Sequence, residues 1–526
     1  MKLRQYLGSL SPLQALLACL ALAYGNGLFN HSLIPSMEPR FAEVVTEMLA
    51  SGHYLIPVKN GVPYVEYPPL LYWLGVLGAK LGLPTEAAIR LPCYLAFLFW
   101  IVLLDRLQGL LWKSWPRGVM ALLGAALPAV LWHFFTAQSD SILILGVLLA
   151  FVGFVEARLG QGRGGFPWKL WVGIALATAA KGPVGIACTL PPMFLELLIS
   201  AMTATRAETD SANLVVRLFR AAAPLKWLRG LLLLVATNLP WYVMAGLDRG
   251  WDFVRAVVVY QNFHRYLTGY DHLQPWWYYF QSALTGLFPI SLLVPLGVWV
   301  SLRRLRSLPE RLVLTWAIFT FLFFTVSASK QGKYLLPAAP AFVALGLLGA
   351  GSVRRISADR VMLWLKRWAA GLVALWALAV VLVLPFYSNR IADVRDYALI
   401  RQAIEERPGK LVSYRWPRAL QLYELGAPMD YVNSARQLYA EIRGGRMAPG
   451  DYLMVSGIYR PGPAGHSSAT TLSPWPGPPY FEPVLSLKTE KNLQLFRLLP
   501  GAGSLAVPAT PEPERPDWRS AEFDTD

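Results

Sequence analysis

The chain has 526 residues, of which 55% are hydrophobic and only 15% are charged, and its mean hydropathy is +0.41. A soluble enzyme of this length carries more charge, so the composition excludes that class and predicts a polytopic membrane protein. The net charge of +16 does not indicate nucleic-acid binding, because the lysines and arginines cluster in short loops between apolar runs, as the positive-inside rule expects.

The first residues, MKLRQ, precede an apolar run that contains Ala21-Leu22-Ala23, a pattern also typical of a signal peptide. We prefer an uncleaved first span, because many further apolar segments follow and polar residues begin close behind it. With either interpretation, the residues after this run emerge on the outer side of the membrane.

Apolar segments of about 20 residues, the length that crosses a bilayer, recur as far as residue 387. The candidate spans are 10–29, 88–105, 117–135, 141–157, 169–180, 184–201, 228–247, 280–300, 311–327, 334–350 and 366–387. Lys181 interrupts what would otherwise be one long helix. The shorter run Leu70–Leu83 is interpreted as an interfacial helix on the outer face. We predict about 11 to 13 spans, with the N-terminus inside and the C-terminus outside.

Lysine and arginine concentrate in alternate loops, which gives an independent indication of orientation. The basic clusters occur at 106–117, 158–169, 206–229, 303–311 and 354–367, and we assign them to the inner side. The loops on the outer side contain residues 30–87, Asp140, Lys181, 248–277 and 329–334. The polar residues of interest therefore share the outer face.

The passage Pro35–Trp73 is the most polar part of the first 200 residues, although apolar segments flank it. Glu38, Arg40, Glu43 and Glu47 fall on one predicted helix of this passage. Glu43 and Glu47, four residues apart, are interpreted as a solvated helix face. Glu38 and Arg40 begin the helix, where an acid favours the dipole, so a cap and a functional role both stay open.

Asp140 lies at the outer end of a predicted span. It can cap the N-terminus of that helix, it can have a functional role in a site, or both. Four cations, Lys181, Arg265, Lys330 and Lys333, fall on the side where the positive-inside rule disfavours cations. Cations that lie beside carboxylates predict a site for an anionic headgroup such as a phosphate.

Metal ligands and cysteine chemistry give weaker signals. His264 and His272 flank Gly269, and Glu66 lies in a Tyr/Pro-rich turn from which it could join either histidine, but HRYLTGYDH matches no standard metal-binding motif. The residues 276–279, two Trp and two Tyr, are interpreted as an interfacial aromatic belt. The three cysteines, Cys19, Cys93 and Cys188, have no paired spacing and are interpreted as small buried hydrophobic residues.

After the last span the apolar runs shorten to strand length. The predicted strands are 410–414, 427–432, 452–457, 483–488 and 493–499, and the predicted helices are 395–406, 418–425 and 435–443. This alternation predicts a small α/β domain on the outer side, to which no catalysis is assigned because it has no Gly-rich phosphate loop. The predicted domains are a membrane domain 1–387 with its first outer loop at 30–87, an α/β domain 388–500 that includes a Pro/Gly/Ser-rich loop at 460–479, and a disordered tail 501–526.

Nine motifs follow one another in the sequence: MEPRFAE, GVPYVEYPPLLYW, AAIRLP, TAQSD, KGPVG, LPWY, NFHRY, HLQPWWYY and SASKQGKYLLP. This series resembles the polyprenyl-phosphate-sugar-dependent glycosyltransferases of the GT-C architecture. Within them it is most similar to the bacterial aminoarabinose transferases of lipid A and their protein mannosyltransferase relatives. The resemblance covers roughly residues 10–350.

The resemblance implies transfer of a sugar from a lipid phosphate such as undecaprenyl phosphate to an acceptor, for example aminoarabinose to lipid A. The reaction would take place at the periplasmic face of the bacterial inner membrane, and we expect a monomer. Glu38 and Arg40 match the acidic and basic positions of the family's Asp-Glu-x-Arg motif, and Asp140 matches its second outer-loop acid. Glu66 matches the acid of a Tyr-x-Glu-x-Pro motif that binds a divalent metal in some members.

The resemblance also implies which residues surround the donor phosphate and which carry the chemistry. The positions expected around the phosphate are Arg40, Lys181, Arg265, Lys330, Lys333 and Tyr334. Asp140 and Glu38 are the predicted catalytic acids. A divalent metal ion is the candidate cofactor, with Glu66 and His264 as its candidate ligands.

The chain departs from the family pattern at two places. Met37 stands where the family's first motif begins with Asp, and Tyr260-Gln261-Asn262 stands where its outer loop reads Glu-His-Asn, so the expected histidine is missing. His264, three residues beyond Gln261, is the candidate substitute.

The loss of the first acid leaves two options. A hydroxyl acceptor needs a general base, worth about 10²–10⁴ in rate, which Glu38 or Asp140 would then supply, whereas a phosphate acceptor is already anionic and needs none. Three other functions stay open: a flippase for lipid-linked sugars, a protein O-mannosyltransferase-like enzyme, and a homologue that binds the donor without turnover. The flippase is disfavoured by the absence of an internal repeat in the sequence.

Overall fold

The structure is a computed structural model that describes residues 11–34, 37–161, 165–203, 213–268, 272–352, 358–386, 394–414, 417–433, 435–456, 480–487 and 493–502. Outside these residues lie the predicted loop at 460–479, nearly all of the predicted tail, Gly269, and several of the predicted inner cations. The chain forms two compact units, which are described separately. The first comprises Met1–Asn30, His53–Pro57 and Tyr64–Val383, and the second comprises His31–Gly52, Val58–Pro63 and Leu384–Asp526.

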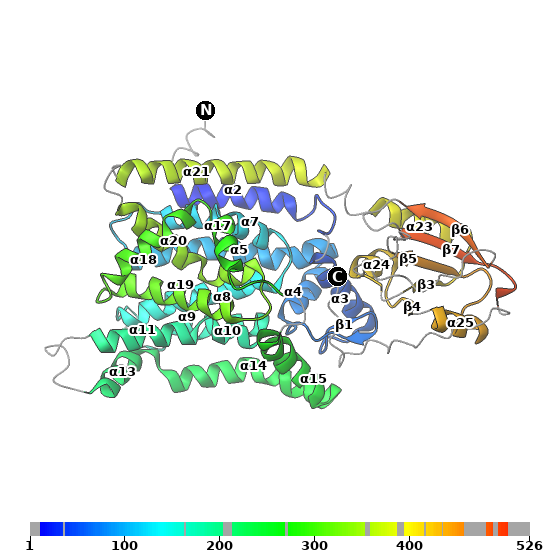
Figure 1. Ribbon diagram of the computed structural model, residues 1–526, viewed down its shortest axis with the longest axis horizontal. Coiled ribbons are helices and arrows are strands. Elements are labelled where there is room, and N and C mark those ends of the chain that lie inside the picture. Colours follow the sequence, from blue (N-terminus) through cyan, green and yellow to red (C-terminus); the bar gives the residue numbers. More distant parts are fainter. Residues whose placement is uncertain are drawn as a thin grey trace. The chain divides into compact units, whose positions relative to one another are not determined.

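All the named elements in the described residues of the first unit are helices, and they lie roughly along one direction (Figure 1). Its elements are α2 (Pro12–Gly27), α4 (Leu70–Lys80), α5 (Thr85–Leu111), α6 (Val119–Ala125), α7 (Pro128–Phe135), α8 (Ser139–Arg158), α9 (Trp168–Lys181), α10 (Pro183–Ala187), α11 (Leu190–Thr203), α13 (Leu214–Ala222), η1 (Ala223–Leu225), α14 (Trp227–Arg249), α15 (Trp251–Arg255), η2 (Ala256–His264), α16 (Arg265–Leu267), α17 (Tyr278–Gly286), η3 (Ile290–Leu292), α18 (Val294–Leu302), α19 (Leu308–Val326), η4 (Gly332–Ala338), α20 (Ala339–Gly351), α21 (Ala358–Leu378) and η5 (Ala379–Val383).

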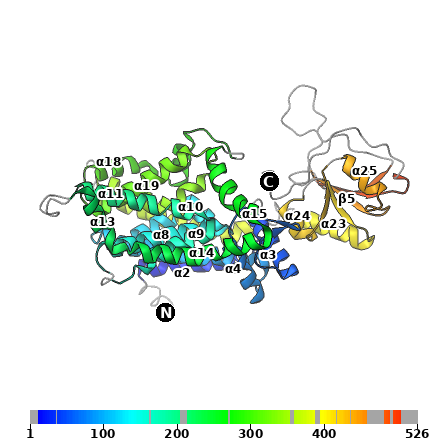
Figure 2. The same ribbon diagram turned by 90° about the horizontal axis from the view of Figure 1, so that it is seen from below.

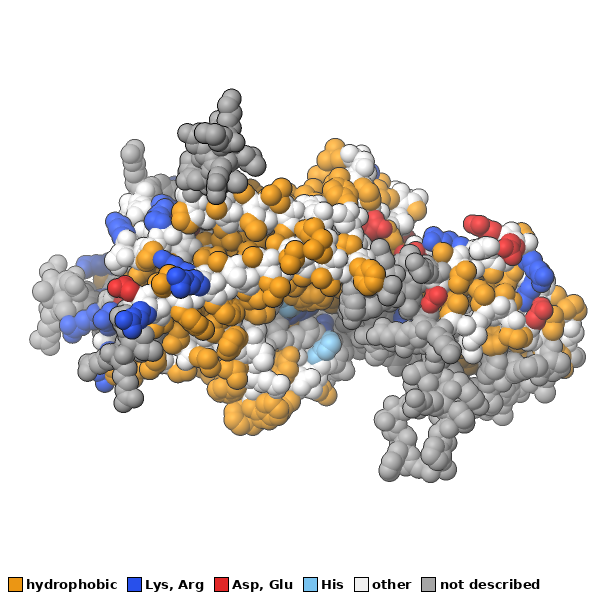
Figure 3. All heavy atoms as spheres, turned by 90° about the horizontal axis from the view of Figure 1, so that it is seen from above, with side chains coloured by type: hydrophobic (Ala, Val, Ile, Leu, Met, Phe, Trp, Pro, Cys, Tyr) orange, Lys and Arg blue, Asp and Glu red, His pale blue; other side chains and the backbone are white. Residues whose placement is uncertain are grey.

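Seven helical segments among the described residues are long and apolar enough to cross a membrane. They are Thr85–Leu111, Ser139–Arg158, Pro183–Thr203, Trp227–Arg249, Leu308–Val326, Gly332–Gly351 and Asp359–Phe386. The prediction of a polytopic helical membrane protein is thus confirmed. On the face drawn in Figure 3, Lys and Arg side chains gather at one end of these helices and apolar side chains cover their length, an asymmetry typical of membrane proteins.

Two of the predicted spans are not continuous helices. The span 117–135 divides into α6 and α7, and the span 280–300 divides into α17, η3 and α18. Pro128 opens α7, and Pro289 stands directly before η3. Since proline lacks the backbone N–H and clashes with the preceding turn, it ends one helix and starts the next. The break expected at Lys181 is present, with Gly182 between α9 and α10.

The pair α8 and α9 forms the centre of the first unit (Figure 1). Gly146, Gly153 and Gly173 lie at its contact, and a Cβ added at Gly146 would meet the backbone nitrogen of Ala177 at 2.7 Å. Only glycine permits this closeness of two backbones. The helices run antiparallel, so the first turn of α8 lies beside the last turn of α9.

The second unit contains a five-stranded sheet with three helices, and each of its strands overlaps one of the segments that the sequence predicts as a strand. The strands are β3 (Leu411–Tyr414), β4 (Asp430–Val432), β5 (Tyr452–Ser456), β6 (Phe481–Leu487) and β7 (Leu493–Leu498), and the helices are α23 (Val394–Glu406), α24 (Ala419–Leu425) and α25 (Ala435–Arg443). The sheet order is β4-β3-β5-β7-β6. β3 pairs in parallel with β4 and β5, whereas β7 is antiparallel to β5 and β6.

The second unit also includes α3 (Glu38–Ser51) and the hairpin of β1 (Val58–Lys59) and β2 (Val62–Pro63). The side-chain amide of Asn60 pairs with the backbone of Met429: its Nδ2 donates to the carbonyl oxygen over 3.1 Å and its Oδ1 accepts from the N–H over 2.7 Å. The hairpin of the first outer loop is therefore joined to the α/β domain within one compact unit.

The interpretation of Glu43 and Glu47 as a solvated face is wrong, because both side chains are buried. Glu43 Oε1 accepts the backbone N–H of Asn60 at 2.9 Å, and Glu47 Oε1 accepts that of Gly61 at 2.6 Å. Both turn residues have positive φ, 51° and 75°, a tight geometry that leaves N–H groups in need of acceptors. Burial and the neighbouring Glu47 raise the pKa of Glu43 well above its usual value, against the opposing effect of Lys59.

Two further interpretations are corrected in part. Tyr279 is fully buried and does not belong to an interfacial belt, whereas Trp276 and Trp277 are exposed. Cys93 and Cys188 are buried as expected, and Cys19 is partly exposed.

Candidate active site

Asp140 is the centre of a buried ion cluster. Its Oδ1 lies 2.6 Å from Lys181 Nζ, and its Oδ2 lies 3.4 Å from Lys333 Nζ. The side chains of Asp140, Lys181 and Lys333 are 3%, 11% and 8% exposed, so all three charges are held largely away from water. An acid so buried requires partners of this kind.

The local sequence explains how these three residues meet. Asp140 is in the first turn of α8, and Lys181 is the last residue of α9 before Gly182 ends the helix with φ of 65°. Lys333 comes from η4, between α19 and α20. The N-cap of α8 is Gln138. The main contacts of Asp140 are with the two ammonium groups, so capping of the helix does not account for its position.

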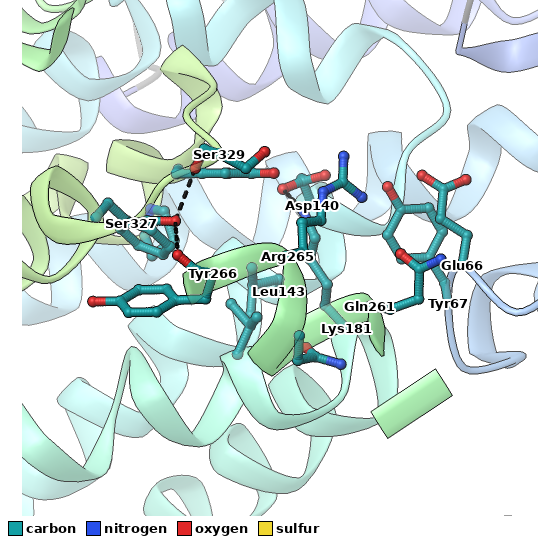
Figure 4. Close-up of a pocket in the computed structure, with 15 residues that line it drawn as sticks. Glu66, Tyr67, Asp140, Leu143, Lys181, Gln261, Arg265, Tyr266, Ser327 and Ser329 are labelled. Atoms are coloured by element: carbon teal, nitrogen blue, oxygen red, sulfur yellow. Dashed lines mark hydrogen bonds and ion pairs between the residues drawn. The ribbon is translucent and has the colours of Figure 1, made fainter. Parts of the chain in front are cut away.

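A pocket of about 690 Å³, counted out to solvent, opens beside this cluster. Its lining residues are Glu66, Tyr67, Asp140, Leu143, Lys181, Val184, Gln261, Asn262, Arg265, Tyr266, Phe324, Ser327, Ser329, Tyr334 and Pro337. Figure 4 shows Asp140, Lys181 and Arg265 in the middle of the pocket, with Glu66 and Tyr67 on one side and Tyr266, Ser327 and Ser329 on the other.

Aromatic rings surround the Lys181 ammonium group. Lys181 Nζ lies 5.6 Å from the ring centre of Tyr67 and 5.2 Å from that of Tyr334, within the range of cation–π attraction. The ring of Tyr334 is itself 5.2 Å from that of Phe324. The cation therefore has Asp140 and two aromatic rings as neighbours, and the other walls of the pocket carry both polar and apolar side chains.

The segment 327–330 contributes Ser327 and Ser329 to the pocket and is bound to α16 and to His272. The N–H of Ala328 donates to the carbonyl of Tyr266 over 2.8 Å, and the N–H of Lys330 donates to that of His272 over 3.0 Å. The Lys330 ammonium group donates to the carbonyl of Ser327. Lys330 thus holds this loop, and it is not among the residues that line the pocket.

The structure brings together five of the predicted site residues in this one pocket: Glu66, Asp140, Lys181, Arg265 and Tyr334. Lys333 does not line this pocket but is connected to it by its ion pair with Asp140. The pocket residues that sequence reasoning missed are Tyr67, Tyr266, Ser327 and Ser329, and the departure at Gln261 and Asn262 falls on its wall.

The predicted residues of the first outer helix belong to the second unit. Glu38 is fully buried, and its Oε2 accepts the backbone N–H of Ile34 at 2.8 Å. Met37 is the N-cap residue of α3 and gives that helix no side-chain cap. The predicted roles of Glu38 as a catalytic acid and of Arg40 as a phosphate ligand stay predictions.

Glu66 and His264, the candidate metal ligands, do not form a ligand set on their own. Glu66 accepts a hydrogen bond from the hydroxyl of Tyr64. His264 is exposed, and its Nδ1 lies 3.1 Å from Thr268 Oγ1. Among the described residues no three His, Cys, Asp or Glu side chains are grouped as a metal site. The metal therefore stays a prediction, and no chemical step is assigned to it.

A second pocket is lined by Lys333, the other lysine of the ion cluster. It measures about 750 Å³ out to solvent and is lined by Ala129, His133, Ser282, Ala283, Thr285, Gly286, Leu287, Gln331, Gly332, Lys333, Leu335 and Leu336. Lys333 lines this second pocket, whereas Lys181 lines the first. Asp140 contacts both lysines, so the ion cluster connects the walls of the two pockets.

Comparison with known proteins agrees with the resemblance. No protein-family model matches the chain. It is 27% identical over 377 residues to an undecaprenyl phosphate-α-4-amino-4-deoxy-L-arabinose arabinosyl transferase of Pseudomonas fluorescens, covering 70% of this chain and 65% of that protein. It is 27% identical over 329 residues to the transferase of the same name from Edwardsiella ictaluri, covering 61% and 56%. The chain thus matches less than two thirds of the length of these relatives.

The structural likeness extends over nearly the whole chain. ArnT of Cupriavidus metallidurans, solved with undecaprenyl phosphate bound, superposes with a TM-score of 0.67 at 18% identity, over 93% of this chain and 98% of that one. The apo structure of the same protein gives a TM-score of 0.62 over 84% and 91%. The chain is therefore similar in sequence to the bacterial undecaprenyl-phosphate-aminoarabinose transferases and has the membrane fold of ArnT.

Proposed function

We propose that this protein is a glycosyltransferase that moves a sugar from an undecaprenyl phosphate donor to a lipid acceptor, with aminoarabinose and lipid A as the first pair to test. The observation that carries the proposal is the buried cluster of Asp140, Lys181 and Lys333 beside a pocket that also contains Arg265. A homologue of the aminoarabinose transferases with such a cluster has the groups needed to hold a lipid phosphate.

The charge of the site suits the leaving group. Lys181, Lys333 and Arg265 supply three positive charges around Asp140 and Glu66. In the transfer, the bond between the anomeric carbon and the donor phosphate oxygen breaks, and the acceptor oxygen forms the new bond. The donor phosphodiester carries one negative charge, and the released phosphate carries about 1.5 to 2. Positive groups that are already in place stabilise this growing charge without reorganisation.

Asp140 serves in this proposal to position the two lysines. Each of its oxygens is near one ammonium group, so it could accept a proton from an acceptor hydroxyl only by breaking an ion pair. An acceptor that is itself a phosphate needs no base. This arrangement favours a phosphate acceptor such as that of lipid A over a hydroxyl acceptor.

The second pocket is proposed as the place from which the acceptor reaches the sugar. It has polar groups along its wall, among them His133, Ser282 and Gln331, and it shares Lys333 with the ion cluster. Donor phosphate at Lys181 and acceptor at Lys333 would lie on opposite sides of Asp140. We place this site at the periplasmic face of the inner membrane, since the pocket residues come from the loops that the charge pattern puts outside.

The test is turnover by purified protein in lipid nanodiscs supplied with undecaprenyl-phosphate aminoarabinose and lipid A. The expected products are modified lipid A and free undecaprenyl phosphate in equal amounts. Because Met37 stands at the position of the family's first acid, a donor-binding homologue without turnover is the second candidate. Tight donor binding with no release of lipid phosphate, over a panel of sugars and acceptors, would identify that second candidate instead.

A further inference from the structure

A third pocket lies at the opposite end of α8 and α9 from the candidate active site. It is lined by Gly153, Glu156, Ala157, Gly160, Gly165, Phe166, Pro167, Trp168, Lys169, Arg220, Ala223, Pro224 and Lys226. Sixteen residues of helix separate Asp140 from Glu156, a rise of about 24 Å at 1.5 Å per residue. That distance approaches the thickness of the hydrocarbon core of a bilayer, so this pocket belongs to the other membrane surface.

The acid of this pocket is already neutralised. Glu156 Oε1 lies 2.8 Å from Lys169 Nζ and 2.9 Å from Arg106 Nη2. Arg220 and Lys226 also line the pocket, and no carboxylate of the described residues forms an ion pair with either. The pocket therefore has an excess of positive charge that the described protein does not compensate.

Hydrogen bonds hold the backbone of the segment that carries these two cations. The indole N–H of Trp171 donates to the carbonyl of Leu225 over 2.7 Å, and Arg158 Nη1 donates to that of Ala221 over 3.1 Å. Between η1 and α14, Lys226 has φ 51° and ψ 49°, a left-handed conformation that lysine disfavours and glycine or asparagine adopts more readily. A lysine at such a position suggests that its side chain has a role.

The helix beside the pocket has the pattern of a membrane-surface helix. None of the described residues of α13 is buried, and its Leu214, Val215 and Phe219 are 43%, 59% and 72% exposed, while Arg217 and Arg220, three residues apart, share the opposite, polar face. Figure 2 shows α13 beside α11 at one end of the first unit. An amphipathic helix with arginines lies at the boundary of headgroups and acyl chains.

Apolar surface suited to acyl chains continues from the pocket along α14. Only 28% of the apolar stretch of this helix is buried, and Leu228, Leu232 and Val235 are 74%, 61% and 50% exposed. Trp168 at the pocket is 61% exposed, as is typical of an interfacial tryptophan. Cations at the pocket and exposed apolar side chains beside it match the two parts of an anionic phospholipid.

We propose that this pocket binds the phosphate group of an anionic phospholipid, with Arg220 and Lys226 as its cationic ligands and the acyl chains along α14. The site is separate from the transfer reaction, and its occupant is a lipid of the leaflet opposite to the active site. Since a basic residue near an anionic bilayer surface contributes about 1 kcal/mol, loss of each cation should weaken binding about fivefold.

The test measures binding of phosphatidylglycerol and phosphatidylcholine to the full-length protein by native mass spectrometry from detergent. The protein should retain phosphatidylglycerol in preference, and Arg220→Gln with Lys226→Gly together should weaken its retention about 25-fold. Lys226→Gly also relieves the left-handed backbone, so it should not lower the melting temperature. Arg229→Gln is the matched control, because Arg229 is exposed in the first turn of α14 and does not line the pocket.

Three outcomes would overturn the proposal. The first is equal retention of the two lipids by the native protein, and the second is unchanged retention of phosphatidylglycerol by the double variant. The third is displacement of the lipid by millimolar inorganic phosphate, which would identify a site for a soluble anion instead. None of these measurements depends on glycosyl transfer, so their results test the lipid site independently of the proposed reaction.

Discussion

Asp140 and Lys181 form the shortest contact of the ion cluster, with 2.6 Å between Oδ1 and Nζ, although 41 residues separate them in the chain. The antiparallel packing of α8 and α9 produces this contact, and Lys333 adds a second ammonium group 3.4 Å from the other carboxylate oxygen. The same two side chains thus join the packed helices and belong to the site that we propose for the donor phosphate.

Asp140→Asn should both destabilise the protein and abolish sugar transfer. The substitution leaves two buried ammonium groups without their anion, and removing one partner of such a buried pair costs about 3–5 kcal/mol. We expect a lower melting temperature and no release of undecaprenyl phosphate. The double variant Asp140→Asn/Lys333→Met should regain part of the melting temperature without activity. Full turnover of the single variant would remove Asp140 from the mechanism.

Lys181→Met and Lys330→Met form a matched pair of substitutions. Lys181 lines the pocket, whereas the Lys330 ammonium group is bound to the Ser327 carbonyl within the loop. Loss of Lys181 should lower kcat by about 10²–10³, the usual effect of removing one group that stabilises the transition-state charge. Loss of Lys330 should change kcat by less than about tenfold, measured by the same release of lipid phosphate. Equal losses from the two variants would contradict the assignment.

Thr285→Trp should fill the second pocket, where Thr285 is a lining residue. If the acceptor binds in this pocket, KM for lipid A should rise, because the tryptophan takes the space of the acceptor in both the ground state and the transition state. The affinity for the donor, measured by binding of undecaprenyl phosphate, should stay within about twofold of the native value. Loss of donor affinity with unchanged KM for the acceptor would instead assign the donor to the second pocket and the acceptor to the first.

Glu66→Gln and His264→Ala test the predicted metal site. Glu66 lines the pocket beside Tyr67, but His264 is exposed and does not line it. We expect turnover to fall by about tenfold or more with Glu66→Gln, as for loss of a positioned polar group, and to remain near native with His264→Ala. If both variants lose turnover and excess Mn²⁺ restores it, the two residues share a metal.

Glu43 gives the second unit a pH dependence. Its folded-state pKa is raised by burial and by Glu47, so the folded state holds this proton more tightly than the unfolded chain does. The stability contributed by the proton is fully present below the unfolded-state pKa of 4.5 and is lost as pH rises through the raised value.

Glu43→Gln keeps an oxygen that can accept the Asn60 N–H but does not ionise. Hydrogen exchange of the Asn60 and Gly61 amides should therefore become less dependent on pH, after correction for intrinsic exchange, than in the native protein. Glu482→Gln, at an exposed position of β6 in the same unit, is the control. An unchanged pH profile in the Glu43 variant would show that Glu43 does not govern the hairpin.

The position of charges in the sequence indicates more of the candidate site than local sequence pattern does. Lys181 and Arg265 were identified because cations are disfavoured on the outer side, and both line the pocket with Asp140. Tyr67 and Tyr266 were missed, although each directly follows a predicted residue, because an aromatic side chain near a membrane surface is common and carries no distinguishing pattern.

Segments whose environment is set by distant parts of the chain were predicted less well. Glu43 and Glu47 have the spacing of an exposed helix face, but the turn at Asn60 and Gly61 covers them. Hydrophobic spacing cannot foresee that a later hairpin will supply N–H donors. In contrast, the strands after residue 410 are recognisable locally, because short apolar runs bounded by turn residues are sufficient to define them.

The glycine contact between α8 and α9 has a mechanical consequence. Because the two backbones touch at Gly146, Gly153 and Gly173, the helices have little freedom to slide along each other, and they form a single rod across the membrane. Lys181 and Asp140 are at one end of this rod, and Lys169 and Glu156 are at the other. A tilt of the rod would displace both ends together, so the membrane surface at one end and the candidate active site at the other share one rigid support.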